Sequence, residues 1–133
     1  MLNSFSIHLM AVFLGGGCGA LFRWLLSLKL NPARPWIQLG TLAANLSGAL
    51  IIGLMAAFLA AKPGWPPEVR LFCLTGLLGG LTTFSTFSWE VIELLERGHI
   101  GPGLLTVALN LIGSLGLTAI GLLLGRLLFS PGQ

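Results

Sequence analysis

The charged residues of this chain gather in short clusters and leave four long uncharged stretches. These stretches are residues 1–22, 35–61, 71–89 and 100–125. A helix needs about 20 predominantly apolar residues to cross the hydrocarbon core of a bilayer, and each stretch is close to or above that length. Only 8% of the residues are charged and 55% are hydrophobic, whereas about a quarter of a soluble domain is charged. The pattern predicts an all-α membrane protein.

The spans together occupy most of the chain, so we expect one four-helix transmembrane domain over residues 1–133. The expected spans are approximately 5–28, 36–61, 69–97 and 101–127. Prolines and glycines fill the turns between them and would stop a helix there. Lipid is therefore the expected partner of most of the surface.

The basic residues divide almost evenly between the two ends of such a bundle. Three are expected on the side of the chain termini and four on the opposite side: Lys62, Arg70 and Arg126 against Arg23, Lys29, Arg34 and Arg97. An imbalance of Lys and Arg between short loops sets the orientation of a membrane protein, so the sequence determines the orientation of this chain only weakly. Either a small bias or a partner fixes one orientation, or copies insert both ways and pair antiparallel. With no basic run, nucleic acid is not an expected partner.

The third stretch contains an unusual polar and aromatic run from Thr82 to Phe87, preceded by paired glycines. Glycine, β-branched and hydroxyl residues make a poor helix centre. Irregular backbone at membrane depth is tolerated where protein buries it or where it lines a cavity. The run therefore predicts a broken third helix, whose freed carbonyl groups are able to coordinate a cation.

The same run carries groups suited to an anion. Phe84 and Phe87 are three residues apart and share a face if helix resumes after the break. Aromatic rings have positive edges, which meet an anion without the full counter-charge that would trap it, and conduction requires binding weak enough for release. Hydroxyl groups in the run are able to donate hydrogen bonds to the same anion: Thr82, Thr83, Ser85 and Thr86.

Two polar stripes accompany this run. In the second span they are Gln38, Thr41, Asn45 and Gly48, and in the fourth Thr106, Asn110, Ser114 and Thr118. Each set falls on one helical face. The stripes either form hydrogen bonds that only hold the helices together or line a hydrated path for an ion. Arg23, near the end of the first span, is either an interfacial anchor or part of a positive vestibule.

An enzyme is not expected. The chain contains no Asp, and its two histidines lie near segment ends, so no catalytic constellation is available. Two other functions remain open beside an ion channel. A small dual-topology proton-coupled exporter of cationic compounds would need a carboxylate deep in the membrane, and Glu90 lies past the break. A non-conducting assembly subunit would explain the 19 glycines but would leave the polar stripes idle.

Three motifs give the chain a resemblance to the Fluc (CrcB) fluoride channel family. They are Gly16-Gly-Cys-Gly-Ala-Leu-Phe-Arg23, Gly40-Thr-Leu-Ala-Ala-Asn-Leu-Ser-Gly48 and Gly79-Gly-Leu-Thr-Thr-Phe-Ser-Thr-Phe-Ser-Trp-Glu90. The resemblance covers essentially the whole chain. It implies a fluoride-selective channel that exports fluoride from the cytoplasm and relieves its toxicity. It also implies an antiparallel, dual-topology homodimer with two pores in a bacterial inner membrane.

The resemblance also implies residue roles. Phe84 and Phe87 would present ring edges to fluoride, Asn45 would be the pore asparagine and Arg23 the vestibule arginine. A structural sodium ion at the dimer centre would be held by the backbone carbonyls of Gly79 and Thr82. Members often carry a tyrosine in the fourth span, but this chain has none. If the track aligns, Thr106 takes that place and Asn110 replaces a serine. The expected pore residues are thus Phe84, Phe87, Asn45, Thr41, Ser85, Thr86, Thr106, Asn110, Ser114 and Arg23.

Overall fold

The computed structural model describes residues 3–31 and 36–129. Within these ranges the chain is helical and contains no strand. Its elements are α1 (Ser4–Leu30), α2 (Leu39–Ala61), α3 (Pro67–Arg70), the π-helix η1 (Leu71–Leu78), α4 (Gly79–Leu81), α5 (Phe84–Glu96) and α6 (Ile100–Phe129). Arg34, one of the basic residues counted for orientation, lies outside the described ranges.

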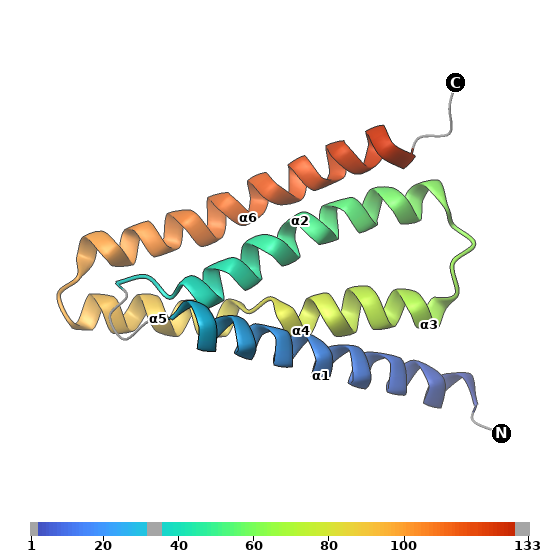
Figure 1. The fold of residues 1–133 in the computed structure, drawn as a ribbon, viewed down its shortest axis with the longest axis horizontal. Coiled ribbons are helices and arrows are strands. Elements are labelled where there is room, and N and C mark those ends of the chain that lie inside the picture. The colour runs from blue at the N-terminus through green and yellow to red at the C-terminus, as the bar shows by residue number, and fades with distance from the viewer. Residues whose placement is uncertain (1–2, 32–35, 130–133) are drawn as a thin grey trace.

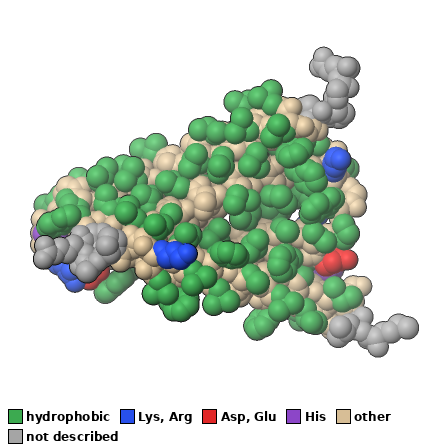
Figure 2. Space-filling view, viewed as in Figure 1, with side chains coloured by type: hydrophobic (Ala, Val, Ile, Leu, Met, Phe, Trp, Pro, Cys, Tyr) green, Lys and Arg blue, Asp and Glu red, His purple; other side chains and the backbone are tan. Residues whose placement is uncertain are grey.

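Four helical segments are long and apolar enough to cross a membrane. They are α1, α2, the segment Pro67–Glu96 that includes α3 to α5, and α6. The prediction of four membrane-spanning segments is confirmed in this sense. Large apolar side chains point outward along them, as Phe13 does with 79% of its surface exposed. Figure 2 shows hydrophobic side chains over much of the visible face, with few charged groups among them. Such a surface suits lipid as solvent.

Local sequence signals explain where the helices begin and end. Asn3 caps α1, since its side chain accepts a hydrogen bond from the amide of Ser6, one of the donors that a helix start leaves unpaired. Gly98 has φ +79°, and the amide of His99 donates to the carbonyl of Leu94 at 2.8 Å. This left-handed glycine closes α5 and turns the chain into α6.

The helices pack as two pairs. Helix α2 lies along α6, and α1 lies along η1 and α4. The pairs are close together near α5 and diverge toward the end that holds the beginning of α1 and the end of α6 (Figure 1). The molecule is therefore wedge-shaped.

Small residues set the close approach within the first pair. Gly15 and Gly19 of α1 face Gly76 and Gly80 of the third segment, and a methyl group added at Gly76 would lie 2.8 Å from the Cα atom of Gly15. In lipid, such small residues let helix backbones approach closely and gain van der Waals contact. The glycines predicted to pack helices tightly therefore do so within one chain at this interface.

Replacing Gly76 with Val should destabilise the protein. The atoms around the new side chain are mainly the backbone of α1, which cannot move aside without separating the two helices, and overpacking of this kind costs roughly 1–3 kcal/mol. We expect a lower midpoint for loss of the monodisperse species when the detergent-purified protein is heated. Gly17→Val is the matched control because, among the residues that the structure describes, no atom lies within 4 Å of an added methyl group there. Equal midpoints for the two variants would contradict the packing argument.

Candidate functional site

The chain between α4 and α5 leaves the helical conformation for two residues. Thr82 has φ −83° and ψ 150°, and Thr83 has φ −149° and ψ 121°. Both values are in the extended region. The helix resumes at Phe84, where the Thr83 hydroxyl oxygen accepts a hydrogen bond from the amide of Thr86 at 3.2 Å. Thr83 is thus the N-cap of α5, a role for which threonine is favoured.

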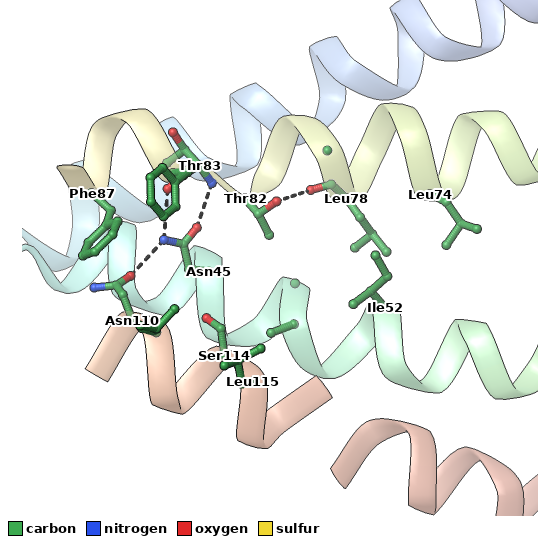
Figure 3. A pocket seen from close by; sticks show the side chains of 15 residues that line it. Asn45, Ile52, Leu74, Leu78, Thr82, Thr83, Phe87, Asn110, Ser114 and Leu115 are labelled. Atoms are coloured by element: carbon green, nitrogen blue, oxygen red, sulfur yellow. Dashed lines mark hydrogen bonds between the residues drawn. The ribbon is translucent and has the colours of Figure 1, made fainter. Parts of the chain in front are cut away.

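Asn45 of α2 binds this extended segment at two points. Its Oδ1 atom accepts from the amide of Thr83 at 2.7 Å, and its Nδ2 atom donates to the Thr83 carbonyl at 3.1 Å. Nδ2 also donates to Oδ1 of Asn110 in α6 at 2.9 Å. Figure 3 shows the two asparagines and Thr83 joined in this way. One side chain therefore connects α2, α6 and the extended segment.

The extended segment removes the helical partners of several carbonyl groups. In a continuous helix the amides of Thr83 and Thr86 would pair with the carbonyls of Gly79 and Thr82. Here the Thr83 amide donates to Asn45 and the Thr86 amide to the Thr83 hydroxyl. The carbonyl oxygens of Gly79 and Thr82 have therefore lost those donors, which leaves oxygen atoms of the kind that hard cations prefer. No cluster of three His, Cys, Asp or Glu side chains suited to a metal occurs among the described residues.

Arg23 reaches the same segment from α1. Its Nε atom donates to the carbonyl of Gly80 at 3.3 Å, and the side chain is partly buried. Arginine inside a membrane protein commonly pairs with backbone carbonyls, and a positive charge is favourable at the C-terminal end of a helix. Arg23 therefore stabilises the end of α4 through this contact. Neither of its two expected roles, an interfacial anchor or part of a positive vestibule, included this contact.

A groove of about 350 Å³ lies beside the extended segment. Figure 3 shows it between the third segment, α2 and α6. Its lining is apolar toward one end and polar at the other, where Asn45 and Asn110 meet Thr83. Seven of the expected pore and sodium-binding residues line it: Asn45, Gly79, Thr82, Phe84, Phe87, Asn110 and Ser114.

The two phenylalanines contact each other at the start of α5. Their ring centroids are 5.3 Å apart with an interplanar angle of 70°, an edge-to-face arrangement. Phe87 is only 8% exposed, whereas Phe84 is 74% exposed. Both rings line the groove, so one is held inside the subunit and the other is presented at its surface. The positive edges of aromatic rings are suited to an anion in such a groove.

The polar stripe of α6 is used mainly for local bonds. Thr106 donates to the carbonyl of Pro102 at 2.9 Å, and Asn110 donates to the carbonyl of Thr106 at 3.0 Å. Hydroxyl groups in membrane helices often bond back to their own helix in this way. Thr118 instead donates across to the carbonyl of Ala49 in α2 at 3.1 Å. The stripe therefore both holds α2 and α6 together and places Asn110 and Ser114 at the groove.

The remaining predicted residues lie outside the groove lining. Ser85 is exposed, and Thr86 is half-buried with its hydroxyl accepting from that of Thr83. Thr41 is buried and donates through its hydroxyl to Oε1 of Glu90. The structure thus gathers the predicted residues around two polar centres, one at Asn45 and one at the pair of Thr41 and Glu90.

Two residues at these centres were outside the expected pore set, although the sequence named the Thr83 hydroxyl as a possible hydrogen-bond donor to an anion and Glu90 as a carboxylate past the break. Thr83 is the point where Asn45 binds, and Glu90 is buried at 9% exposure with no hydrogen-bond partner for Oε2 among the described residues. The position of Thr83 inside the polar run indicated that it belongs to the site. Nothing in the sequence indicated that Glu90 pairs with Thr41, since 49 positions separate them.

Four apolar helical segments, three of which line a partly polar groove, define a multi-pass membrane protein. The chain belongs to the CrcB family. The family's sequence model, described as "CrcB-like protein, Camphor Resistance (CrcB)", matches residues 10–122. The resemblance inferred from the motifs is thereby confirmed.

Proteins of similar sequence match nearly the whole chain. It is 48% identical over 123 residues to a protein of Burkholderia pseudomallei (strain 668) named "Fluoride-specific ion channel FluC", a match that covers 92% of this chain and 96% of the relative. It is 52% identical over 118 residues to a protein of the same name from Burkholderia cenocepacia, covering 89% and 92%. The similarity therefore extends through all four helical segments and both polar centres.

Proposed function

We propose that this protein is a fluoride channel, with transport and not catalysis as its activity. The observation that carries the proposal is the groove beside the extended segment, which is lined both by the rings of Phe84 and Phe87 and by the amides of Asn45 and Asn110. Relatives named as fluoride-specific ion channels share about half of their residues with this chain. Such a channel lets fluoride leave the cytoplasm and relieves its toxicity.

The chemistry of fluoride fits this groove. Fluoride enters cells as hydrogen fluoride, dissociates at neutral pH and must leave as an ion. Its small radius makes the loss of hydration costly, so a pore must replace water with hydrogen-bond donors and ring edges. A groove that has no full positive charge among its lining residues binds weakly enough to release the ion, as conduction requires. Arg23 lies outside that lining and is bound to the Gly80 carbonyl.

The channel unit in this proposal is an antiparallel homodimer in the bacterial inner membrane. Phe84 is 74% exposed although it lines the groove, and a second copy would cover that ring. The near balance of basic residues between the two ends permits insertion in both orientations, which an antiparallel pair requires. Two pores would follow from the two-fold symmetry of the pair.

A structural sodium ion would occupy the centre of this dimer. The carbonyls of Gly79 and Thr82 suit it because both have lost their helical donors at the extended segment. Hard cations surround themselves with several oxygen ligands, and two carbonyls from one chain are too few. The same pair of carbonyls from the second copy would complete the shell, and the ion would then join the two broken third helices.

Fluoride efflux from vesicles tests the proposed function. We expect purified protein in liposomes loaded with fluoride to release it when a potassium ionophore balances the charge, with no pH gradient applied. The rate should exceed that for chloride by at least about two orders of magnitude, corresponding to roughly 2.7 kcal/mol of discrimination. Chloride efflux at a similar rate would contradict selectivity.

The same vesicles separate this function from the proton-coupled exporter. Buried Glu90, whose Oε2 atom has no hydrogen-bond partner in the described part of the chain, is the observation that favours an exporter. An exporter would need an imposed pH gradient to move a cationic compound and would lose that movement on Glu90→Gln substitution. Fluoride efflux without a gradient argues against it.

A further inference from the structure

The side chain of Asn45 has no free hydrogen-bond donor. A carboxamide carries two N–H groups and one carbonyl oxygen. One N–H of Asn45 is directed to the Thr83 carbonyl and the other to Oδ1 of Asn110, while Oδ1 of Asn45 accepts from the Thr83 amide. The side chain is buried at 9% exposure. An anion in the groove would therefore have to displace one of these partners to obtain a bond from Asn45.

The orientation of this amide is determined by its partners. Oxygen and nitrogen atoms of an asparagine are assigned from the surrounding hydrogen bonds. Thr83 offers a backbone donor and a backbone acceptor side by side. A flipped Asn45 would place its Nδ2 atom against the Thr83 amide, donor against donor, and its Oδ1 atom against the Thr83 carbonyl, acceptor against acceptor. Asn110 is oriented as well, because its Nδ2 atom donates to the carbonyl of Thr106. The Thr83 amide therefore donates to Asn45, Asn45 donates to Asn110, and Asn110 donates to Thr106.

The peptide groups that Asn45 binds are those that begin α5. Thr83 is the N-cap of that helix and Phe84 is its first residue. The positions of the rings of Phe84 and Phe87 follow from where the helix starts and how it is directed. Without Asn45, the partly buried Thr83 amide and carbonyl would lose their partners, which is costly for backbone groups.

We propose that Asn45 is a positioning residue: it binds the backbone of Thr83 on both sides and thereby sets the start of α5 and the directions of the two phenylalanine rings, without donating to the anion itself. Arg23 acts at the other side of the extended segment through the Gly80 carbonyl. The proposal rests on fluoride conduction as the proposed function, and it assigns to Asn45 a different task from that of a fluoride ligand.

Nuclear magnetic resonance of the ¹⁵N-labelled protein in detergent micelles tests this directly. The carboxamide signals of Asn45 are identified by their contacts with the Thr83 amide. We expect them to keep their chemical shifts as sodium fluoride is added, compared with matched sodium chloride, and their hydrogens to exchange slowly with solvent. A saturable shift of the Asn45 carboxamide hydrogens with fluoride but not with chloride would overturn the proposal.

Flux measurements on Asn45→Ser give a second readout. Serine is too short to bridge both groups of Thr83, so the rings should lose their positions. We expect the maximal fluoride flux to fall about tenfold or more, because buried groups left unpaired are costly, while the half-saturating fluoride concentration changes by less than about twofold. A lost ligand would instead raise that concentration about tenfold with little change in maximal flux, and this result would overturn the proposal. If Asn45→Ser does not fold, the titration of the unsubstituted protein still decides.

A failure of the positioning role of Asn45 can be distinguished from a failure of the proposed channel function. Unsubstituted protein without fluoride flux would refute the channel. The binding of Thr83 by Asn45 would then still be measured by hydrogen exchange of the Thr83 amide, which should be slow in the unsubstituted protein and faster in Asn45→Ser. Equal exchange in the two proteins would refute the positioning role whatever the flux.

Discussion

Replacing Phe87 with Ile should lower fluoride flux by about 30- to 100-fold, equivalent to roughly 2–3 kcal/mol in the barrier. Phe87 lines the groove, is 8% exposed and meets Phe84 edge to face. Isoleucine occupies a similar part of the site but has no aromatic quadrupole, so it offers no positive edge to an anion. Electrostatic contacts are strongest where water is excluded, and Phe87 is the more buried of the two rings.

The measurement is fluoride efflux from liposomes at equal protein density, with Phe58→Ile as the matched control. Phe58 packs edge to face with Trp65 and Phe129, each at 5.0 Å between ring centroids, and it does not line the groove. We expect Phe58→Ile to retain flux within a few-fold. If both substitutions reduce flux equally, general loss of packing and not the ring edge is responsible.

Substituting Asn45 by Asp should abolish measurable fluoride flux, a loss of more than about 100-fold. The carboxylate would still accept from the Thr83 amide, but it could donate neither to the Thr83 carbonyl nor to Oδ1 of Asn110. Three oxygen acceptors would then face one another without a hydrogen between them. Burying a charge without a partner is among the costliest changes in a protein interior, and a negative charge at the groove also repels fluoride.

Asn31→Asp is the matched control for this substitution. Asn31 accepts a hydrogen bond through Oδ1 from the amide of Gly40 at 2.7 Å, and an aspartate there keeps that acceptor. Its side chain is half-buried at the end of α1, so the added charge is partly solvated. We expect near-normal folding and flux for Asn31→Asp. Retention of flux by Asn45→Asp at the level of Asn31→Asp would show that the donors of Asn45 are not needed.

The positions of the helical segments were largely predictable from the sequence. The length of an uncharged, apolar stretch is a property of one segment, and a bilayer requires about 20 such residues. The polar and aromatic run from Thr82 to Phe87 likewise stood out because such residues conflict with a helix centre. The extended conformation falls at Thr82 and Thr83, the first two residues of that run.

The partners of the polar side chains were not predictable in the same way. Asn45 and Thr83 are 38 positions apart, and Arg23 and Gly80 are 57 apart. The sequence placed Glu90 only as a carboxylate past the run, whereas the structure buries it against Thr41. The sequence also placed Thr41 and Thr106 in one lining with the phenylalanines, whereas Thr106 bonds back to its own helix and Thr41 belongs to a second polar centre.

The sequence by itself determined that this chain forms four apolar helical segments and that the third contains a run unfit for a regular helix. Only the tertiary structure decided which groups satisfy that run: Asn45 at Thr83, Arg23 at Gly80, and the groove beside them. The physical reason is that hydropathy and helix propensity act along one segment. A hydrogen bond between helices depends on how closely, and in what register, small residues such as Gly15 and Gly76 allow the backbones to pack.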